Sequence, residues 1–214
     1  MLRAAALLAI AAVAAGPAAA CSMMPGYKVP TNLELTAAAD TIVIARVDGG
    51  KRGASSFESE VFATPTTLLK GARLPGRIAL PGSTIIDDPR ILVTRSDPRE
   101  LRAPNRDALS GGCVRYAFRS DMQLVLFLKR GKGGKLTPYR SAFSRDAEDV
   151  SGPGALWVKA VREYGAISAL APGARPAALR RRIAALRADG GADASAIADD
   201  MQVELTGRRR PPFD

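Results

Sequence analysis

The chain has 214 residues, with 31 Lys or Arg, 21 Asp or Glu and no His, so its formal net charge is +10. The absence of His excludes Ser-His-Asp and Cys-His catalysis and any zinc site built on imidazole. Two Cys are too few for a four-cysteine zinc site or an iron–sulfur cluster. The length suits one domain, or one domain with a helical extension.

Residues 1–20 (MLRAAALLAIAAVAAGPAAA) have the parts of a secretory signal peptide. Arg3 provides the positive start, residues 4–15 are apolar, and small residues follow a Gly-Pro break. The apolar run is about 12 residues long, whereas a membrane span needs roughly 20, and no later segment is long and apolar enough. We therefore expect an exported protein, periplasmic or extracellular, without a transmembrane segment once residues 1–20 are removed.

Cleavage after Ala20 would leave Cys21 as the first residue, and Cys113 is the only other cysteine. Two cysteines in an exported chain suggest one disulfide, which here would close a loop of about 90 residues. The alternative is a lipoprotein signal, in which Cys21 carries diacylglycerol and anchors the protein to a membrane. Ala18 stands where that signal prefers Leu, so the sequence favours the disulfide and leaves the lipid anchor as the alternative.

A short helix is expected at 31–40, capped by Thr31 or Asn32 with Glu34 in its first turn. Short extended segments separated by Gly- and Pro-containing turns then follow. The expected extended segments are 41–47, 57–71 with a break or bulge at Pro65, 77–82, 83–96 as strand-turn-strand, 113–118, 122–130 and 136–143; the turns are 49–53 and 131–135, and 97–112 is an exposed polar loop. Their spacing predicts an all-β barrel or sandwich for 41–145.

The pattern changes to helical spacing after residues 151–154. Helices are expected at 155–170, from Pro176 to Gly190-Gly191, and around Ile197, Met201 and Leu205 as far as Gly207. We predict a helical extension at 151–207, packed on or beside the strands, and a disordered tail at 208–214. The fold class is therefore α+β, mainly β with C-terminal helices.

Several features together resemble the bacterial relatives of the netrin-like (NTR) module, whose best-known members are the tissue inhibitors of metalloproteinases. They are a Cys at the mature N-terminus, a short helix ending Ala39-Asp40, the strand TIVIARV, a strand running into Leu69-Lys70-Gly71, and a second Cys in CVRYAF ahead of MQLVLFL. The resemblance covers about residues 21–145. It implies a five-stranded OB-type barrel over 21–150 with helices packed against it, and a disulfide from Cys21 to Cys113 at a strand start.

The resemblance also implies a role for the mature N-terminus. In the inhibitors, the α-amine and carbonyl of the first Cys chelate the protease zinc, and the second residue enters the specificity pocket. By position these roles would fall to Cys21 and Ser22. The inhibitors begin Cys-x-Cys, whereas Met23 stands third here, so the edge would be less preorganised. We expect a non-enzymatic binding protein of the envelope or extracellular space, with metalloprotease inhibition as an alternative.

The basic residues include a group on or next to one predicted hairpin. Its members are Lys129, Arg130, Lys132, Lys135 and Arg140. They predict attraction to an unidentified protein or to an anionic envelope component such as lipid headgroups or acidic polysaccharide, although a solvated Arg-rich surface explains the same charges. Export and an aromatic content of 5% argue against a nucleic-acid partner.

A carboxylate-dependent hydrolase is a further alternative. Its candidate acids are Asp87-Asp88, Asp199-Asp200 and the group Asp146, Glu148 and Asp149. Short charge runs are usually solvated, so we expect these carboxylates to be exposed. The sequence has no Ser-x-x-Lys, Gly-x-Ser-x-Gly or Ca-loop pattern. We therefore assign no catalytic residue, metal ligand or cofactor.

Overall fold

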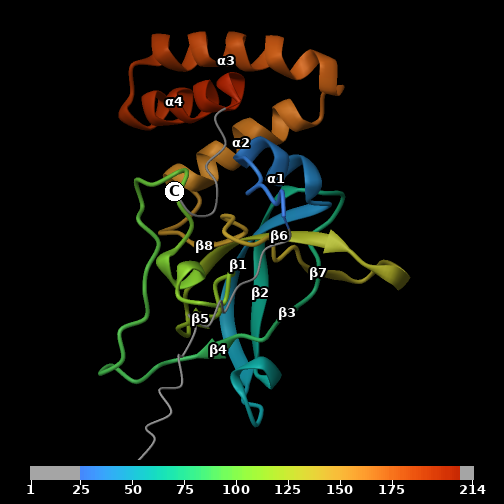
Figure 1. The fold of residues 1–214 in the computed structure, drawn as a ribbon, viewed down its shortest axis with the longest axis vertical. Helices are drawn as coiled ribbons and strands as arrows, with labels where there is room; N and C mark the ends of the chain where they lie inside the picture. Colours follow the sequence, from blue (N-terminus) through green and yellow to red (C-terminus); the bar gives the residue numbers. More distant parts are fainter. Residues whose placement is uncertain (1–24, 208–214) are drawn as a thin grey trace, which may run out of the picture.

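The computed structural model describes residues 25–207; the expected signal at 1–20, Cys21, Ser22 and the tail at 208–214 lie outside this range. The elements in chain order are α1 (Asn32–Ala38), β1 (Thr41–Lys51), β2 (Glu60–Lys70), β3 (Ile78–Pro81), β4 (Thr84–Ile85), β5 (Ala117–Phe118), β6 (Gln123–Arg130), β7 (Leu136–Pro138), β8 (Ala147–Asp149), α2 (Leu156–Ser168), α3 (Arg175–Asp189) and α4 (Ala192–Thr206). An antiparallel sheet followed by C-terminal helices confirms the α+β class (Figure 1).

The main sheet has the strand order β3-β2-β1-β6-β7, and β8 pairs with β6 further along the same strand. Every pairing in it is antiparallel. The two end strands, β3 and β7, approach each other. No ladder of backbone hydrogen bonds joins them within the described chain, so the sheet has an open seam there.

Strands β1 and β6 are buried on both faces. In β1, Ile42 and Ile44 belong to a core shared with the helices, whereas Val43 and Ala45 belong to a second core on the opposite face. Successive side chains of a strand point to opposite faces, so a strand covered on both sides is apolar at every position. β6 has the same double burial from Leu124 to Leu128.

The helices cover one face of the sheet in two layers. Helices α1 and α2 pack against the strands, and α3 and α4 lie beyond α2 (Figure 1). Trp157 of α2 is buried, with its ring centroid 6.0 Å from that of Phe127 in β6. None of the helices in residues 25–207 is long and apolar enough to cross a membrane.

The helix boundaries follow the sequence signals closely. Thr31 and Glu34 form a reciprocal capping box at the start of α1. Gly190 and Gly207 stand in the left-handed region, with φ of 73° and 65°, and end α3 and α4. The register of β1 and β2 shifts opposite Ile44-Ala45, which confirms the bulge expected near Pro65.

Several local predictions are wrong. A turn was expected at 49–53, but residues 49–51 form the end of β1, where Lys51 pairs with Glu60. The second half of 83–96 forms no strand, and only residues 117–118 of 113–118 are extended. The polar stretch 97–112 contains buried residues, namely Leu101, Asn105 and Ala108. Short apolar pairs and polar composition did not predict these conformations. Side-chain contacts to distant residues, and not the local pattern, hold the segment between β4 and β5 in place.

Candidate functional site

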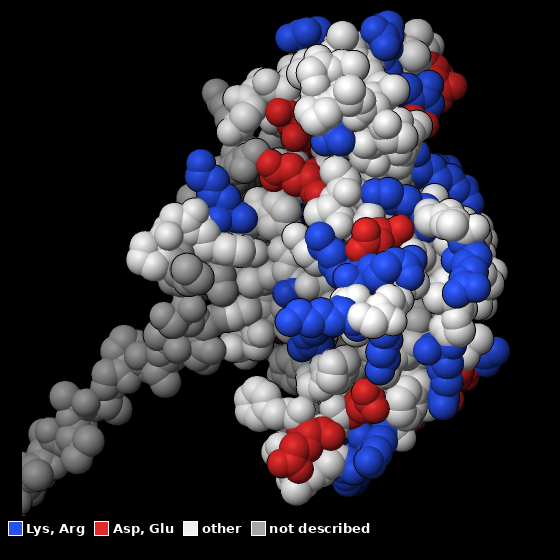
Figure 2. Space-filling model, turned by 90° about the vertical axis from the view of Figure 1, so that its right-hand side faces the viewer, with Lys and Arg blue, Asp and Glu red and all other residues white. Residues whose placement is uncertain are grey.

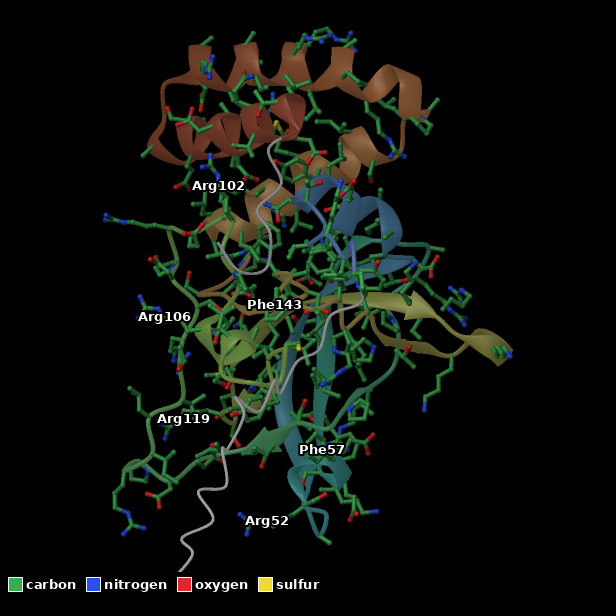
Figure 3. The ribbon with its side chains drawn as sticks, in the orientation of Figure 1. Arg52, Phe57, Arg102, Arg106, Arg119 and Phe143 are labelled. Atoms are coloured by element: carbon green, nitrogen blue, oxygen red, sulfur yellow. The ribbon has the colours of Figure 1, made fainter. Side chains whose placement is uncertain are left out.

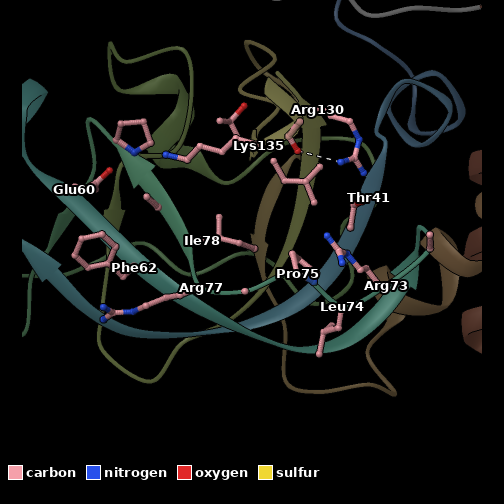
Figure 4. A pocket seen from close by; sticks show the side chains of 17 residues that line it. Thr41, Glu60, Phe62, Arg73, Leu74, Pro75, Arg77, Ile78, Arg130 and Lys135 are labelled. Carbon is pink, nitrogen blue, oxygen red and sulfur yellow. Dashed lines mark hydrogen bonds between the residues drawn. The ribbon is translucent and has the colours of Figure 1, made fainter. Parts of the chain in front are cut away.

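An open groove of about 730 Å³ lies between β3 and β7, along the seam of the sheet (Figure 4). Its wall on one side comes from β3 and the turn before it, and on the other from β7 and the hairpin that links it to β6. Four cations line it: Arg73, Arg77, Arg130 and Lys135. Glu60 is the one acidic residue among the lining residues of the described chain.

The turn between β2 and β3 is held against the start of β1 by a glycine. Gly71 has φ of +119°, and a Cβ at this position would stand 2.9 Å from Oγ1 of Thr41. A larger residue would therefore push the turn away from β1. This close approach carries Arg73, two residues later, to the wall of the groove beside Thr41 (Figure 4).

The groove cations differ in how far they are already paired. Arg77 forms an ion pair with Asp48 at 2.9 Å, and its guanidinium lies 4.4 Å from the ring centroid of Phe62. Arg130 donates one hydrogen bond from Nη1 to the carbonyl of Gly134 at 3.0 Å. Within residues 25–207, the side chains of Arg73 and Lys135 make no hydrogen bond or ion pair. The groove therefore holds positive charge that the protein itself does not neutralise.

The five cations expected at one hairpin have separate positions in the structure. Arg130 and Lys135 line the groove, and Lys132 is exposed on the hairpin outside its lining. The ammonium of Lys129 lies 5.0 Å from the ring centroid of Tyr139. Arg140 donates from Nη1 to the carbonyl of Pro81 at 2.7 Å and so links the segment after β7 to β3. Burial lowers the pKa of Arg140.

Two groove residues were not predicted from the sequence. Arg73 and Arg77 flank the Leu-Pro-Gly turn between two expected strands, where basic residues are ordinary surface residues. The curling of the sheet brings its end strands β3 and β7 together and so places this turn opposite the hairpin at 130–135. Lys and Arg side chains predominate over the middle of the face that carries the β6–β7 hairpin (Figure 2).

The expectation that the acidic groups are solvated is wrong for the group in and before β8. Asp146 and Glu148 are buried, as is the side chain of Asp149. Arg115 pairs with Asp149, with Nη1 and Oδ1 2.6 Å apart. The backbone N–H of Asn105 donates to Glu148 at 2.9 Å. Glu148 and Asp149 serve as acceptors for a long loop that has few ladder hydrogen bonds of its own.

Of the two adjacent acids on α4, one is exposed and the other is buried. Asp199 is exposed as expected, whereas Asp200 is buried and accepts hydrogen bonds from Nδ2 of Asn32 at 2.6 Å and the hydroxyl of Tyr164 at 2.7 Å. Burial raises the pKa of Asp200. Arg102, beside the helical layer in Figure 3, approaches the same carboxylate from the loop at 3.5 Å.

Asp87 and Asp88 lie in a surface turn, in agreement with the expectation for them. Asp88 pairs with Arg90, and Asp87 accepts from the backbone and hydroxyl of Ser120. Over residues 25–207, no group of three or more His, Cys, Asp or Glu is arranged to hold a metal ion.

Cys113 takes part in a disulfide, and its backbone has a positive φ of 57°. Cys21 lies outside the described residues, so the pairing of these two cysteines stays a prediction, as does the exposed N-terminal edge of Cys21 and Ser22. Comparisons of the chain with protein-family models, curated proteins and solved structures found no match.

Proposed function

We propose that this protein is an exported, non-enzymatic binding protein that holds an anionic component of the cell envelope in the groove between β3 and β7. The observation that carries the proposal is the charge of the groove, where four cations from two chain segments face one acid. A hollow lined by one sign of charge concentrates the field and attracts ligands of the opposite sign.

The fold is proposed to be an OB-type barrel of the netrin-like kind. The approach of the end strands β3 and β7 supports this, since a five-stranded barrel with one open seam has the same arrangement. A buried apolar core on the sheet face opposite the helices supports it further. Such barrels are known to bind ligands on their strand faces and loops.

The alternatives rest on different residues. Metalloprotease inhibition and a lipid anchor both depend on Cys21, and inhibition also depends on Ser22. A carboxylate hydrolase would need acids free to act on a substrate, but Asp149 is paired with Arg115, and Asp146 and Glu148 are already acceptors. Binding through the groove is therefore the function that the described residues favour.

The test uses the mature chain, residues 21–214, and two anionic probes: soluble polygalacturonate and vesicles containing phosphatidylglycerol. The variant R73Q/K135Q removes two unpaired groove charges, and R180Q/R181Q removes two exposed charges from α3 as a matched control. Near an anionic surface each charge contributes about 1 kcal/mol, so we expect the groove variant to bind at least ~10-fold more weakly. Equal losses in the two variants would indicate attraction by net charge alone and would refute the groove as the site.

A further inference from the structure

Two arginines, Arg73 and Arg130, line one end of the groove. Arg73 comes from the turn after β2, and Arg130 comes from the last position of β6. Their side chains enter the groove from opposite sides of Thr41, the first residue of β1 (Figure 4). Lys135 belongs to the other end, where it extends toward Glu60 (Figure 4).

The charge at this end is not balanced by the protein. The nearby carboxylate of Asp40 accepts a hydrogen bond from the backbone N–H of Arg130 at 2.7 Å. Against this one acid stand Arg73, Arg130 and the neighbouring Lys70, whose ammonium donates to backbone carbonyls at the end of α1. Like charges that are held together cost free energy until a counter-charge arrives.

We infer that the Arg73–Arg130 end of the groove binds the phosphate group of a phosphate monoester, an inference that rests on the proposed function of the groove. A phosphate monoester carries a charge of about −1.5 to −2 at neutral pH. A guanidinium fork matches two phosphate oxygens in a bidentate contact, so two forks fit one phosphate group. A carboxylate or a phosphodiester carries a single charge and would neutralise only one of the two guanidiniums.

The rest of the groove has room for the organic part of such an ester. Its volume of about 730 Å³ is several times that of a phosphate group. Leu74 lines it beside Arg73, and Ile78 and Phe62 line it farther along (Figure 4). The same phosphate chemistry occurs in soluble sugar phosphates and in lipids that carry a terminal phosphate. The experiment below separates these two sources.

The soluble arm measures binding of glucose 1-phosphate and glucuronate to the mature chain by calorimetry at pH 7.5 and 150 mM salt. The membrane arm measures binding to vesicles that carry phosphatidic acid or phosphatidylglycerol at matched surface charge. We expect at least a 10-fold preference for the monoester in one arm or both. Preference in the soluble arm alone identifies a free phosphate ester, and preference in the membrane arm alone identifies a lipid headgroup.

The variants test the assigned residues. R73Q alters a side chain without a partner in the described chain and should reduce monoester binding at least 10-fold, with an unchanged unfolding midpoint. R130Q, which also removes the hydrogen bond to the carbonyl of Gly134, should reduce monoester binding by the same factor, and R180Q/R181Q should bind as the unmodified chain does. The preference should also fall between pH 7 and pH 5, because the monoester takes up a proton near pH 6.

Equal affinity for monoester and singly charged probes, or unchanged binding by R73Q and R130Q, would overturn the inference. If polygalacturonate and phosphatidylglycerol vesicles still bind through the groove in that case, the proposed function stands without the phosphate clamp. If no anionic probe binds to the groove, both fail together.

Discussion

Asp146 is a buried carboxyl group just before β8. Its Oδ2 accepts a hydrogen bond from the backbone N–H of Ser141 at 2.9 Å, and Arg140 attracts its charge while Glu148 repels it. Burial is the largest influence and raises the pKa of Asp146 to about 7. The folded protein therefore holds a proton on this group, between about pH 4 and pH 7, that the unfolded chain releases.

This difference predicts the sign of a pH effect. The stabilising proton is fully bound below about pH 4, and its contribution is lost as the pH rises toward 7. In D146N no proton is taken up at this position. The unfolding free energy of the variant minus that of the unmodified chain should therefore increase between pH 4 and pH 7. The gain is at most ~4 kcal/mol, at about 1.4 kcal/mol per pKa unit. Urea unfolding across this range is the measurement.

The control is Asp189→Asn, a change at an exposed carboxylate. A difference between D146N and the unmodified chain that does not change with pH would contradict the prediction.

Tyr164 joins α2 to α4 by a hydrogen bond to Asp200. Burial and the neighbouring carboxylate raise the pKa of Tyr164, so the phenol remains a donor. Y164F should lower the free energy of unfolding by about 1.5–3 kcal/mol, the usual contribution of a hydrogen bond to a charged group. Chemical denaturation checks this against Y139F, since the hydroxyl of half-buried Tyr139 makes no hydrogen bond among the described residues. Similar losses in both variants would show that the Asp200 contact contributes little.

At the scale of elements, the long segment between β4 and β5 is held mainly by side chains. Ser96 donates to Asp149 from both its backbone N–H and its hydroxyl, at 2.8 and 2.9 Å. Arg115 reaches the same carboxylate and the carbonyl of Thr94. The loop is therefore attached to β8 through one buried ionic cluster, not through a strand ladder.

Breaking that cluster from one side should be costly. R115M removes the buried cation that pairs with Asp149 and leaves only the exposed Arg95, whose Nη1 lies 3.9 Å from Oδ2 of Asp149. It should lower the unfolding free energy by about 3–5 kcal/mol. In the double variant R115M/D149N the losses should fall short of additivity by at least ~1 kcal/mol, because both changes remove the same contact. Urea unfolding of the three variants measures this coupling. R46M, which removes an exposed ion pair with Asp121, is the control, with an expected effect of up to ~1 kcal/mol. Additive losses would contradict the prediction.

At the scale of the whole molecule, helices and strands share one core. Ile44 of β1, Phe127 of β6, Trp157 of α2 and Ile183 of α3 belong to the same buried cluster. The C-terminal helices therefore protect the outer face of the central strands from water. The groove lies at the seam between β3 and β7, and none of the helices α1 to α4 contributes to its lining.

The remaining whole-molecule prediction concerns the bridge between Cys21 and Cys113. The oxidised mature chain should weigh two hydrogens less than the reduced chain, and reduction should lower its unfolding free energy by up to roughly 4–5 kcal/mol for a loop of about 90 residues. Intact mass of the soluble and membrane fractions, with and without reduction and alkylation, is the measurement. Acyl mass on Cys21 in the membrane fraction would contradict the bridge and identify a lipid anchor.

Elements governed by local pattern were predictable. Helix α1 begins at a capping box, α3 and α4 end at glycines, and the centres of β1 and β6 (42–45 and 124–128) are apolar runs. For these elements, neighbouring residues in the chain contain the necessary information. The strands expected at 83–96 and 113–118 were predicted to be longer than β4 and β5 are. Apolar pairs such as Ile91-Leu92 also occur in exposed loops, and here Leu92 is 92% exposed. The spacing of apolar residues alone does not distinguish a short strand from an exposed loop.

Local sequence patterns were sufficient to predict the class of fold, several helix ends, the central strands and the excess of positive charge. The partner and the burial of each charge depend on the folded arrangement of the chain. Asp149 is buried because Arg115, 34 positions earlier, supplies its partner. Arg73 belongs to a site because the curled sheet brings the end strands β3 and β7 together and places its turn opposite Arg130. The cost of burying a charge and the field of a groove both depend on distances between residues far apart in the chain, and only the folded chain sets those distances.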